Sequence, residues 1–187
     1  MSLPMSDSPA PHSLDPDLYR VVPLDERHIP ALLALFEQSV RRMGPEHYSP
    51  AQVEQWALGA RHPGLASQLR EHHGWIIEQE GIPLGFVTLS DDGHLSLLYV
   101  SADHPRQGLG GLLLARALQA ASQLGLPSLT TEASAFSLAL FLRHGFEQAG
   151  LETVERGGVS FVRHRLYCRL PSQGQPLKYP PFPQSNE

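Results

Sequence analysis

The stretch Leu95–Leu118, LSLLYVSADHPRQGLGGLLLARAL, contains the features on which the fold prediction depends. Its first six residues form a mostly apolar run that is typical of a buried strand. Leucines and alanines then recur at helical spacing from Leu112 to Ala121. Between these segments lies Ser101–Gly111, a loop with three glycines and one arginine. A strand, a glycine-rich loop and a helix in this order predict a phosphate-binding turn, because the first helical N–H groups have no intrahelical partner.

The loop sequence narrows the choice of phosphate ligand. Gly108 and Gly110 have no Cβ, so a pyrophosphate can approach the backbone, and Arg106 adds positive charge. The loop is not a Walker loop, because no Lys-Ser or Lys-Thr pair follows its glycines. It is not a dinucleotide fingerprint either, because Leu113 stands at the third glycine position of G-x-G-x-x-G.

The segment resembles the acetyl-coenzyme A loop of the GCN5-related N-acetyltransferases (GNAT), whose pattern is Q/R-x-x-G-x-G/A. The matching residues are Pro105–Gly110, with Pro105 in place of the usual Gln or Arg. A second segment, SAFSLALFLRHGF (134–146), is similar to the N-x-x-A-x-x-F-Y-x-x-x-G-F segment of the family. Here Ser134 replaces an Asn that often contacts the cofactor. Phe141 replaces the Tyr that in many members protonates the departing thiolate.

The order of predicted elements, β-α-α-β-β-β-α-β-α-β-β, is also that of the family, and the resemblance covers residues 19–170. It implies an α/β GNAT fold with a central mixed, mostly antiparallel twisted sheet of six to seven strands. A splay between the fourth and fifth strands and about four flanking helices belong to that fold. The expected strands are 19–23, 75–79, 83–90, 94–100, 128–132, 146–154 and 159–166, with a turn at Gly157-Gly158. Helices are expected to follow Asp25 and Ser49, to follow the glycine-rich loop, and to cover 65–70 and 135–144.

Composition and charge limit the possible functions. The chain has 187 residues, 41% of them hydrophobic, which favours one globular domain. A net charge of −5 gives no overall electrostatic support for binding nucleic acid, and no apolar run is long enough to span a membrane. A single cysteine and the absence of a signal-like N-terminus suggest a cytoplasmic protein. Proline-rich composition separates an N-terminal arm (1–17) and a C-terminal tail (171–187) from the domain (18–170).

The resemblance implies acetyl-CoA as co-substrate, without a metal. Backbone groups of Leu98, Tyr99 and Val100 would bind the pantetheine arm, and the Val100 N–H would polarise the thioester carbonyl. The other residues implied to contact the cofactor are Arg106, Gln107, Gly108, Leu109, Gly110, Gly111, Ser134 and Phe141. Ten histidines invite a metal hypothesis, but no Cys/His or H-E-x-x-H spacing accompanies them.

Glu132 is the candidate general base, because it ends the fifth strand beside the expected splay in an otherwise apolar region. It has a structural alternative, which is to cap the helix that starts near Ser134. His94, Ser96 and ordered water remain alternatives for the base, with His94 expected to be a solvated residue after a turn. Phe141 cannot donate a proton, and Ser137, one helical turn earlier, is the candidate general acid.

The acceptor side is suggested by the segment HYSPAQVEQWA (47–57), with ERGGVSFVRHRLYCRL (155–170) later in the chain. Together they resemble a bacterial GNAT subgroup that carries a Tyr…Gln…Trp segment on its second helix. Tyr48 and Trp56 are therefore candidates for the acceptor pocket, with core packing as the alternative. The expected function is acetyl transfer to a primary amine of a small molecule by a monomer or homodimer. A protein or peptide acetyltransferase and a non-catalytic acyl-CoA sensor, which the unusual Pro105 and Phe141 favour, remain alternatives.

Overall fold

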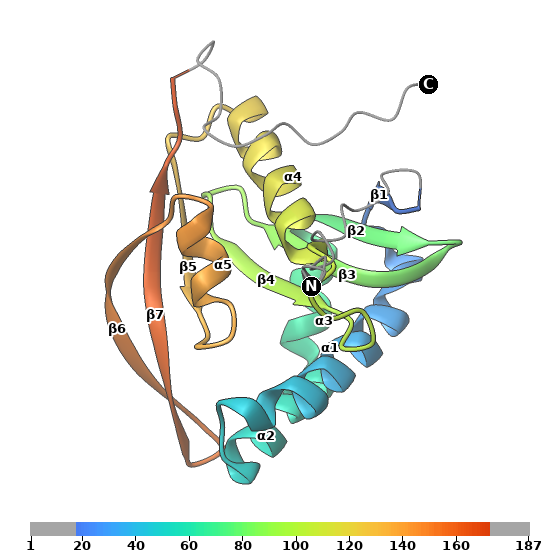
Figure 1. The fold of residues 1–187 in the computed structure, drawn as a ribbon, viewed down its shortest axis with the longest axis vertical. Helices are drawn as coiled ribbons and strands as arrows, with labels where there is room; N and C mark the ends of the chain where they lie inside the picture. Colours follow the sequence, from blue (N-terminus) through green and yellow to red (C-terminus); the bar gives the residue numbers. More distant parts are fainter. Residues whose placement is uncertain (1–17, 173–187) are drawn as a thin grey trace, which may run out of the picture.

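The computed structural model describes residues 18–172, which contain seven strands in two sheets (Figure 1). The first sheet is antiparallel, with the order β1-β2-β3-β4, and the second is antiparallel, with the order β5-β7-β6. The strands are β1 (Arg20–Pro23), β2 (His73–Gln79), β3 (Ile82–Leu89), β4 (Leu95–Val100), β5 (Ser128–Ala133), β6 (Glu147–Arg156) and β7 (Val159–Arg169). The expected seven-stranded α/β fold is confirmed.

Five α-helices accompany these strands in residues 18–172: α1 (Ile29–Met43), α2 (Pro50–Ala57), α3 (Pro63–Glu71), α4 (Leu109–Gln123) and α5 (Leu138–Arg143). The helix starts have local causes. The Ser49 hydroxyl accepts from the Gln52 N–H while the Gln52 side chain accepts from the Ser49 N–H, which makes the expected capping box. None of the helices in this part of the chain is long and apolar enough to cross a membrane.

The two sheets meet at one short seam and then separate. His94 and Thr130 form a parallel bridge, and the Thr131 hydroxyl donates to the Leu95 carbonyl over 2.8 Å. Beyond this seam β4 continues toward α1, while β5 runs with β7 and β6 on the other side (Figure 1). The expected splay between the fourth and fifth strands is therefore present.

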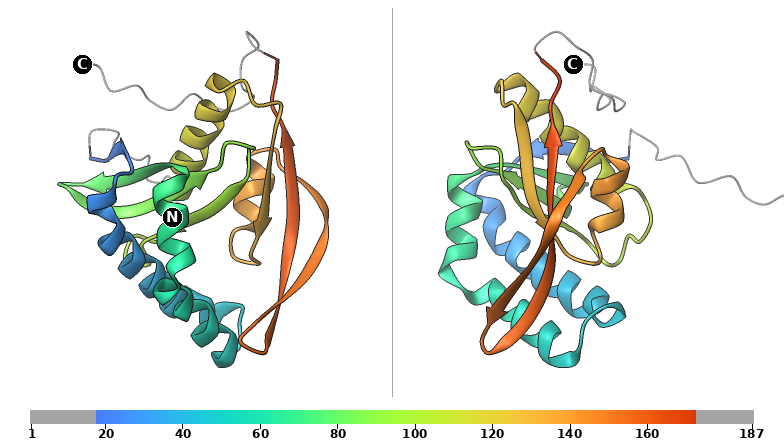
Figure 2. Two further views of the ribbon diagram at one scale, coloured as in Figure 1. Left: turned by 180° about the vertical axis from the view of Figure 1, so that it is seen from behind. Right: turned by 90° about the vertical axis from the view of Figure 1, so that its left-hand side faces the viewer.

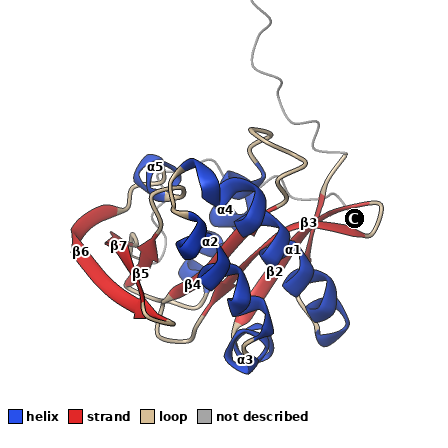
Figure 3. Cartoon of the chain, turned by 90° about the horizontal axis from the view of Figure 1, so that it is seen from below, coloured by secondary structure: helices blue, strands red, loops and turns tan. Residues whose placement is uncertain are grey.

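Two hydrophobic clusters cover opposite faces of the four-stranded sheet, because successive residues of a strand point to opposite faces. On β2, Trp75 and Ile77 belong to a cluster with α4, while Ile76 between them belongs to a cluster with α1, α2 and α3. The α4 cluster extends to the second sheet through residues such as Leu129 and Leu166. Figure 3 shows α1 and α3 on the side of the first sheet that faces the viewer, and Figure 1 shows α4 on the other side.

Two element boundaries differ from the prediction. The fifth helix was expected from Ala135 but begins at Leu138, because residues 135–137 form a turn in which the Ser137 N–H donates to the Ser134 carbonyl. The short helix expected at 65–70 is longer, since Pro63 takes its first position and the His62 side chain accepts from the Gly64 N–H. The predicted arm (1–17) and most of the predicted tail (173–187) lie outside the described residues.

Candidate active site

The glycine-rich loop presents the N-terminus of α4. Gly108 precedes the helix with φ 74° and ψ 6°, a left-handed conformation that favours glycine. The hydrogen-bond ladder of the helix begins with the Leu112 N–H and the Gly108 carbonyl, 3.1 Å apart. The N–H groups of Leu109, Gly110 and Gly111 therefore precede the ladder, where an anion is stabilised. These residues fit a pyrophosphate. The nearby Asp103 carboxylate, which would repel an anion, is paired with Arg42.

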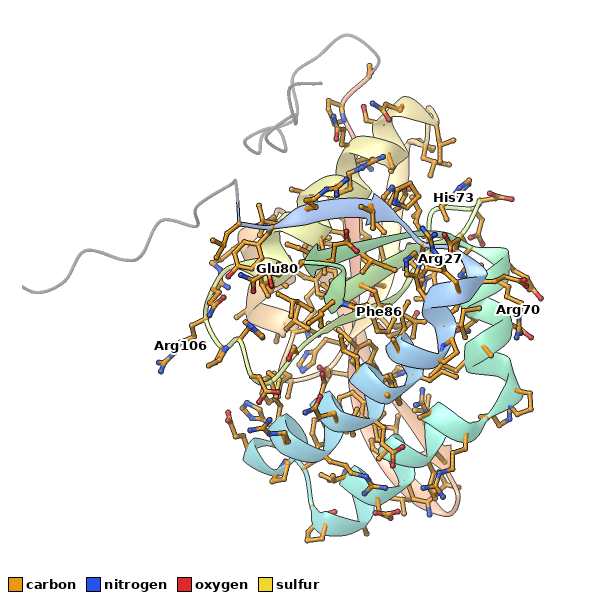
Figure 4. All side chains as sticks on the ribbon, turned by 90° about the vertical axis from the view of Figure 1, so that its right-hand side faces the viewer. Arg27, Arg70, His73, Glu80, Phe86 and Arg106 are labelled. Carbon is orange, nitrogen blue, oxygen red and sulfur yellow. The ribbon has the colours of Figure 1, made fainter. Side chains whose placement is uncertain are left out.

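Neighbouring elements hold this loop in place. The Ser101 N–H donates to the Leu84 carbonyl over 2.7 Å, and the Tyr19 hydroxyl donates to Gln107 Oε1 over 2.6 Å. Arg106 adopts φ 57° and extends outward from the loop, next to the helix N-terminus (Figure 4). Leu109 is buried, so its backbone rather than its side chain is available to a ligand. Ligand contacts by Arg106 and Gln107 stay predictions.

A bulge at Ser96 determines which backbone groups of β4 face the splay. Leu97 pairs with Thr88 and Leu95 pairs with Leu89, which leaves Ser96 as the extra residue. After the bulge, the Ser101 N–H points toward β3, whereas the Val100 carbonyl points away from β3 and accepts from the Ser39 hydroxyl. Because backbone polar groups alternate along a strand, the N–H groups of Leu98 and Val100 also face the splay.

A cavity of about 870 Å³ opens where the sheets diverge. Most of the predicted site residues line it: Tyr48, Trp56, Leu98, Tyr99, Val100, Gly110, Glu132, Ser134, Ser137 and Phe141. The other predicted cofactor residues, Arg106, Gln107, Gly108, Leu109 and Gly111, are not among its lining residues and lie in the loop and first turn of α4. The structure thus joins the predicted acceptor, catalytic and pantetheine residues in one space.

Glu132 forms a pair with His94 in the wall of this cavity. Glu132 Oε2 lies 3.2 Å from His94 Nε2, and His94 Nδ1 lies 3.0 Å from the Thr130 hydroxyl. The two side chains are 27% and 30% exposed, so the cavity and solvent reach both. His94 was expected to be a solvated residue after a turn; it is partly exposed and also bridges the seam between the two sheets. The Glu132 carboxylate has a polar partner in place of the apolar surroundings that its sequence neighbours indicated.

The turn before α5 carries the hydroxyl groups predicted from the second family segment. Ser134 Oγ and Ser137 Oγ lie 3.1 Å apart, and both residues line the cavity. Phe141 also contributes to the lining, but its ring is 3% exposed and packs edge-to-face against Phe146, with 5.1 Å between centroids. Phe141 is therefore mainly a core residue, and its predicted contact with the cofactor stays a prediction.

Phe141→Tyr is expected to lower the free energy of unfolding by about 1–3 kcal/mol without raising kcat, because the new hydroxyl would be buried without a partner. Denaturant unfolding and steady-state rates of both proteins measure this. Phe136→Tyr is the matched control, since Phe136 lines the same cavity and is only partly buried. A higher kcat with unchanged stability would contradict the expectation and would show that the hydroxyl reaches the reacting atoms.

Aromatic side chains form the opposite wall. Trp56 Nε1 donates to the Tyr99 hydroxyl over 3.2 Å, and the Tyr48 and Trp56 rings meet edge-on at 5.2 Å. The Tyr48 hydroxyl accepts from the Ala135 N–H over 3.0 Å, which links the α2 side to the α5 side. Burial raises the pKa of Tyr99 to about 12, so its hydroxyl stays protonated at neutral pH. The prediction used only the backbone of Tyr99 and missed this side chain.

The β6–β7 hairpin supplies the remaining wall, which sequence analysis did not identify. Phe161, Arg156 and Arg163 line the cavity. The hairpin turn at Gly157-Gly158 has φ values of 55° and 76°, as the two glycines predicted. The turn end reaches α2, where Gln52 Nε2 donates to the Ser160 carbonyl over 2.9 Å (Figure 2). In residues 18–172, no group of three or more His, Cys, Asp or Glu side chains is placed to hold a metal ion.

Two sheets that splay apart beside an anion-binding helix N-terminus, with a carboxylate in the cavity between them, are the arrangement of an acyltransferase. The family model for the acetyltransferase (GNAT) domain matches residues 45–168, and the chain therefore belongs to the GNAT acetyltransferases. It is an enzyme of the acetyl-CoA-dependent acyltransferase class.

Known proteins support this assignment. The uncharacterized N-acetyltransferase YafP of Escherichia coli K12 is 27% identical over 142 residues, which cover 76% of this chain and 89% of YafP. A GCN5-related N-acetyltransferase from Rhodopseudomonas palustris has a TM-score of 0.77 at 24% identity, covering 81% of this chain and 95% of its own. The PaiA N-acetyltransferase of Thermoplasma acidophilum, solved with coenzyme A, has a TM-score of 0.65 at 14% identity, covering 81% and 98%. These two structures show the shared fold.

Proposed function

We propose that the chain transfers an acetyl group from acetyl-CoA to the primary amine of a small molecule. The observation that carries this proposal is the Glu132–His94 pair in the wall of a single cavity, whose other walls are the β4 backbone and the aromatic cluster. The far end of the cavity is bounded by α2 and the hairpin, which the Gln52–Ser160 hydrogen bond joins. This boundary favours a small acceptor over an extended peptide, which needs an open groove.

The proposed roles follow from where each polar group points. When bound, acetyl-CoA supplies a thioester whose carbonyl carbon an uncharged amine attacks. Glu132 accepts a proton from the ammonium form of the acceptor, directly or through water, and His94 orients the carboxylate by bonding its Oε2. The Val100 N–H, directed into the splay, donates a hydrogen bond to the oxygen on which negative charge develops.

Two hydroxyl groups are proposed as proton donors to the leaving sulfur. Ser137 was predicted from sequence, and its hydroxyl lies beside that of Ser134. Tyr99 is the addition from the structure, because its oxygen accepts from Trp56 Nε1 and its own proton remains available to the cavity. Phe141 has no such group. The single, buried Cys168 is consistent with the proposed cytoplasmic setting.

Release of free thiol from acetyl-CoA, measured with a panel of small amines and of peptides with free N-termini or lysines, tests the proposal. We expect release with at least one small amine and background rates with the peptides. Faster release with the peptides would favour a protein acetyltransferase. Coenzyme A binding measured by calorimetry, without release by any amine, would favour the acyl-CoA sensor.

A further inference from the structure

The β6–β7 hairpin presents one face to the cavity. Phe161 and Val154 pair across the hairpin and so point to the same face. Arg163 lies two residues from Phe161, and Arg156 lies two residues from Val154, so both arginines point to that face as well. Arg156, Phe161 and Arg163 line the cavity accordingly. On this face Phe161 is buried and Arg156, beside the turn, is exposed; the alternate position Leu151 is 59% exposed. The right-hand view of Figure 2 shows the hairpin running down to its turn beside α2.

The two arginines differ in their partners. Arg163 Nη2 donates to the Glu152 carboxylate, its neighbour across the hairpin, and this charge is therefore balanced. Arg156 has no carboxylate partner within the part of the chain that the structure describes, and its guanidinium carbon lies 5.9 Å from the centre of the Phe161 ring. Its charge also opposes the effect of burial on the pKa of Tyr99, which places the guanidinium near that hydroxyl.

The complementary charge lies farther along the same sheet, because Glu132 on β5 pairs with Arg165 of β7. Among the ionisable residues that line the cavity, Glu132 is the carboxylate, and it lies on β5 next to His94. One end of the cavity thus suits an ammonium, and the hairpin end suits an anion. Tyr48, Trp56 and Phe161 also line the cavity, where their rings pack together and give an apolar surface.

We propose that the acceptor is a small amine that also carries a carboxylate, that Arg156 binds this carboxylate, and that the apolar body of the molecule lies against Tyr48, Trp56 and Phe161. This inference rests on the proposed acetyl transfer and names its substrate class. A polyamine is disfavoured, because it would place a second cation beside an arginine that has no counter-ion. Amino acids with a large apolar side chain have the required groups.

Matched amines test the inference by turnover. Phenylalanine, phenylalaninamide and phenethylamine share one ring and one amine, but only phenylalanine carries a carboxylate. We expect phenylalanine to have the highest kcat/KM, and Arg156→Gln to lower that value at least about tenfold while changing the value for phenethylamine less than twofold. Arg156→Lys should retain part of the preference. Arg20→Gln, at an exposed arginine of β1 outside the cavity lining, is the control.

Binding of acetylated products gives a second measurement that does not need turnover. Calorimetry of N-acetylphenylalanine and N-acetylphenethylamine, each with saturating coenzyme A, should show tighter binding of the carboxylate, and Arg156→Gln should remove the difference. Equal affinities for the two acetylated products, or no binding of N-acetylphenylalanine, would overturn the inference. So would an equal loss of kcat/KM for all three amines in Arg156→Gln. Acetylation only of amines that lack a carboxylate would overturn the inference while leaving the proposed function intact. Carboxylate-selective product binding without turnover of any amine would contradict the proposed function and, with it, the assignment of the acceptor.

Discussion

Glu132→Gln is expected to lower kcat by about 10²–10⁴-fold while leaving affinity for coenzyme A nearly unchanged. The substitution keeps the size of the side chain and a hydrogen-bonding oxygen for His94, but it removes the group that accepts the proton. Glu132 lies on β5, whereas the phosphates are proposed to bind at the N-terminus of α4, so cofactor affinity should not depend on Glu132. Steady-state rates and coenzyme A calorimetry, compared between the two proteins, measure both effects.

Two controls separate catalysis from structure at this position. His94→Gln removes the ring proposed to orient the carboxylate but keeps the proposed proton acceptor, so we expect a smaller loss of kcat than for Glu132→Gln. Thermal unfolding shows whether either variant loosens the seam between the sheets. An active but destabilised Glu132→Gln variant would refute the catalytic role and leave Glu132 as a structural residue.

Gly110→Asp is expected to weaken coenzyme A binding at least about tenfold, which corresponds to ~1.4 kcal/mol or more. The change places a carboxylate where the α4 N-terminus attracts the negative charge of phosphate. The structure adds a steric contribution, because a Cβ at this position would lie 3.1 Å from Leu140 Cδ2 on α5. Calorimetry with coenzyme A provides the measurement.

Gly110→Asn is the matched control for Gly110→Asp. It adds the same number of heavy atoms without the charge, so the difference between the two affinities isolates the electrostatic contribution. Both variants should remain folded, because the atom that the new Cβ meets is the end of a flexible leucine side chain. Unchanged affinity of a folded Gly110→Asp variant would contradict the placement of the phosphates at this helix.

The elements that sequence analysis predicted correctly are those with local causes. The Gly157-Gly158 turn, the capping box at Ser49 and the glycine-rich loop each depend on residues a few positions apart. The order of strands and helices followed from these signals and from hydrophobic periodicity. The start of α5 was placed too early because Ala135–Ser137 form a hydrogen-bonded turn whose residues do not exclude a helix.

The site contacts that were missed depend on pairings between distant segments. The Trp56–Tyr99 hydrogen bond joins residues 43 positions apart, and the Glu132–His94 pair crosses the seam between two sheets. The orientation of Tyr99 also depends on the bulge at Ser96, since one extra residue reverses which face each later side chain occupies. The position of Arg156 could have been predicted from the sequence, because strand alternation across the two-glycine turn places Arg156 and Phe161 on one face of the hairpin.

The division of the molecule into two sheets joined by a short seam separates the proposed donor site from the hairpin proposed to bind the acceptor. The loop proposed to bind the donor lies between β4 of the first sheet and α4. Arg156 and Phe161 lie on a hairpin that the α4 cluster contacts only at the end away from its turn. Exchanging side chains at the hairpin turn therefore leaves the donor site and the folding core in place. The acceptor could therefore change during evolution through substitutions of a few residues near the hairpin turn, and directed libraries confined to that turn should retain folding while they sample new amines.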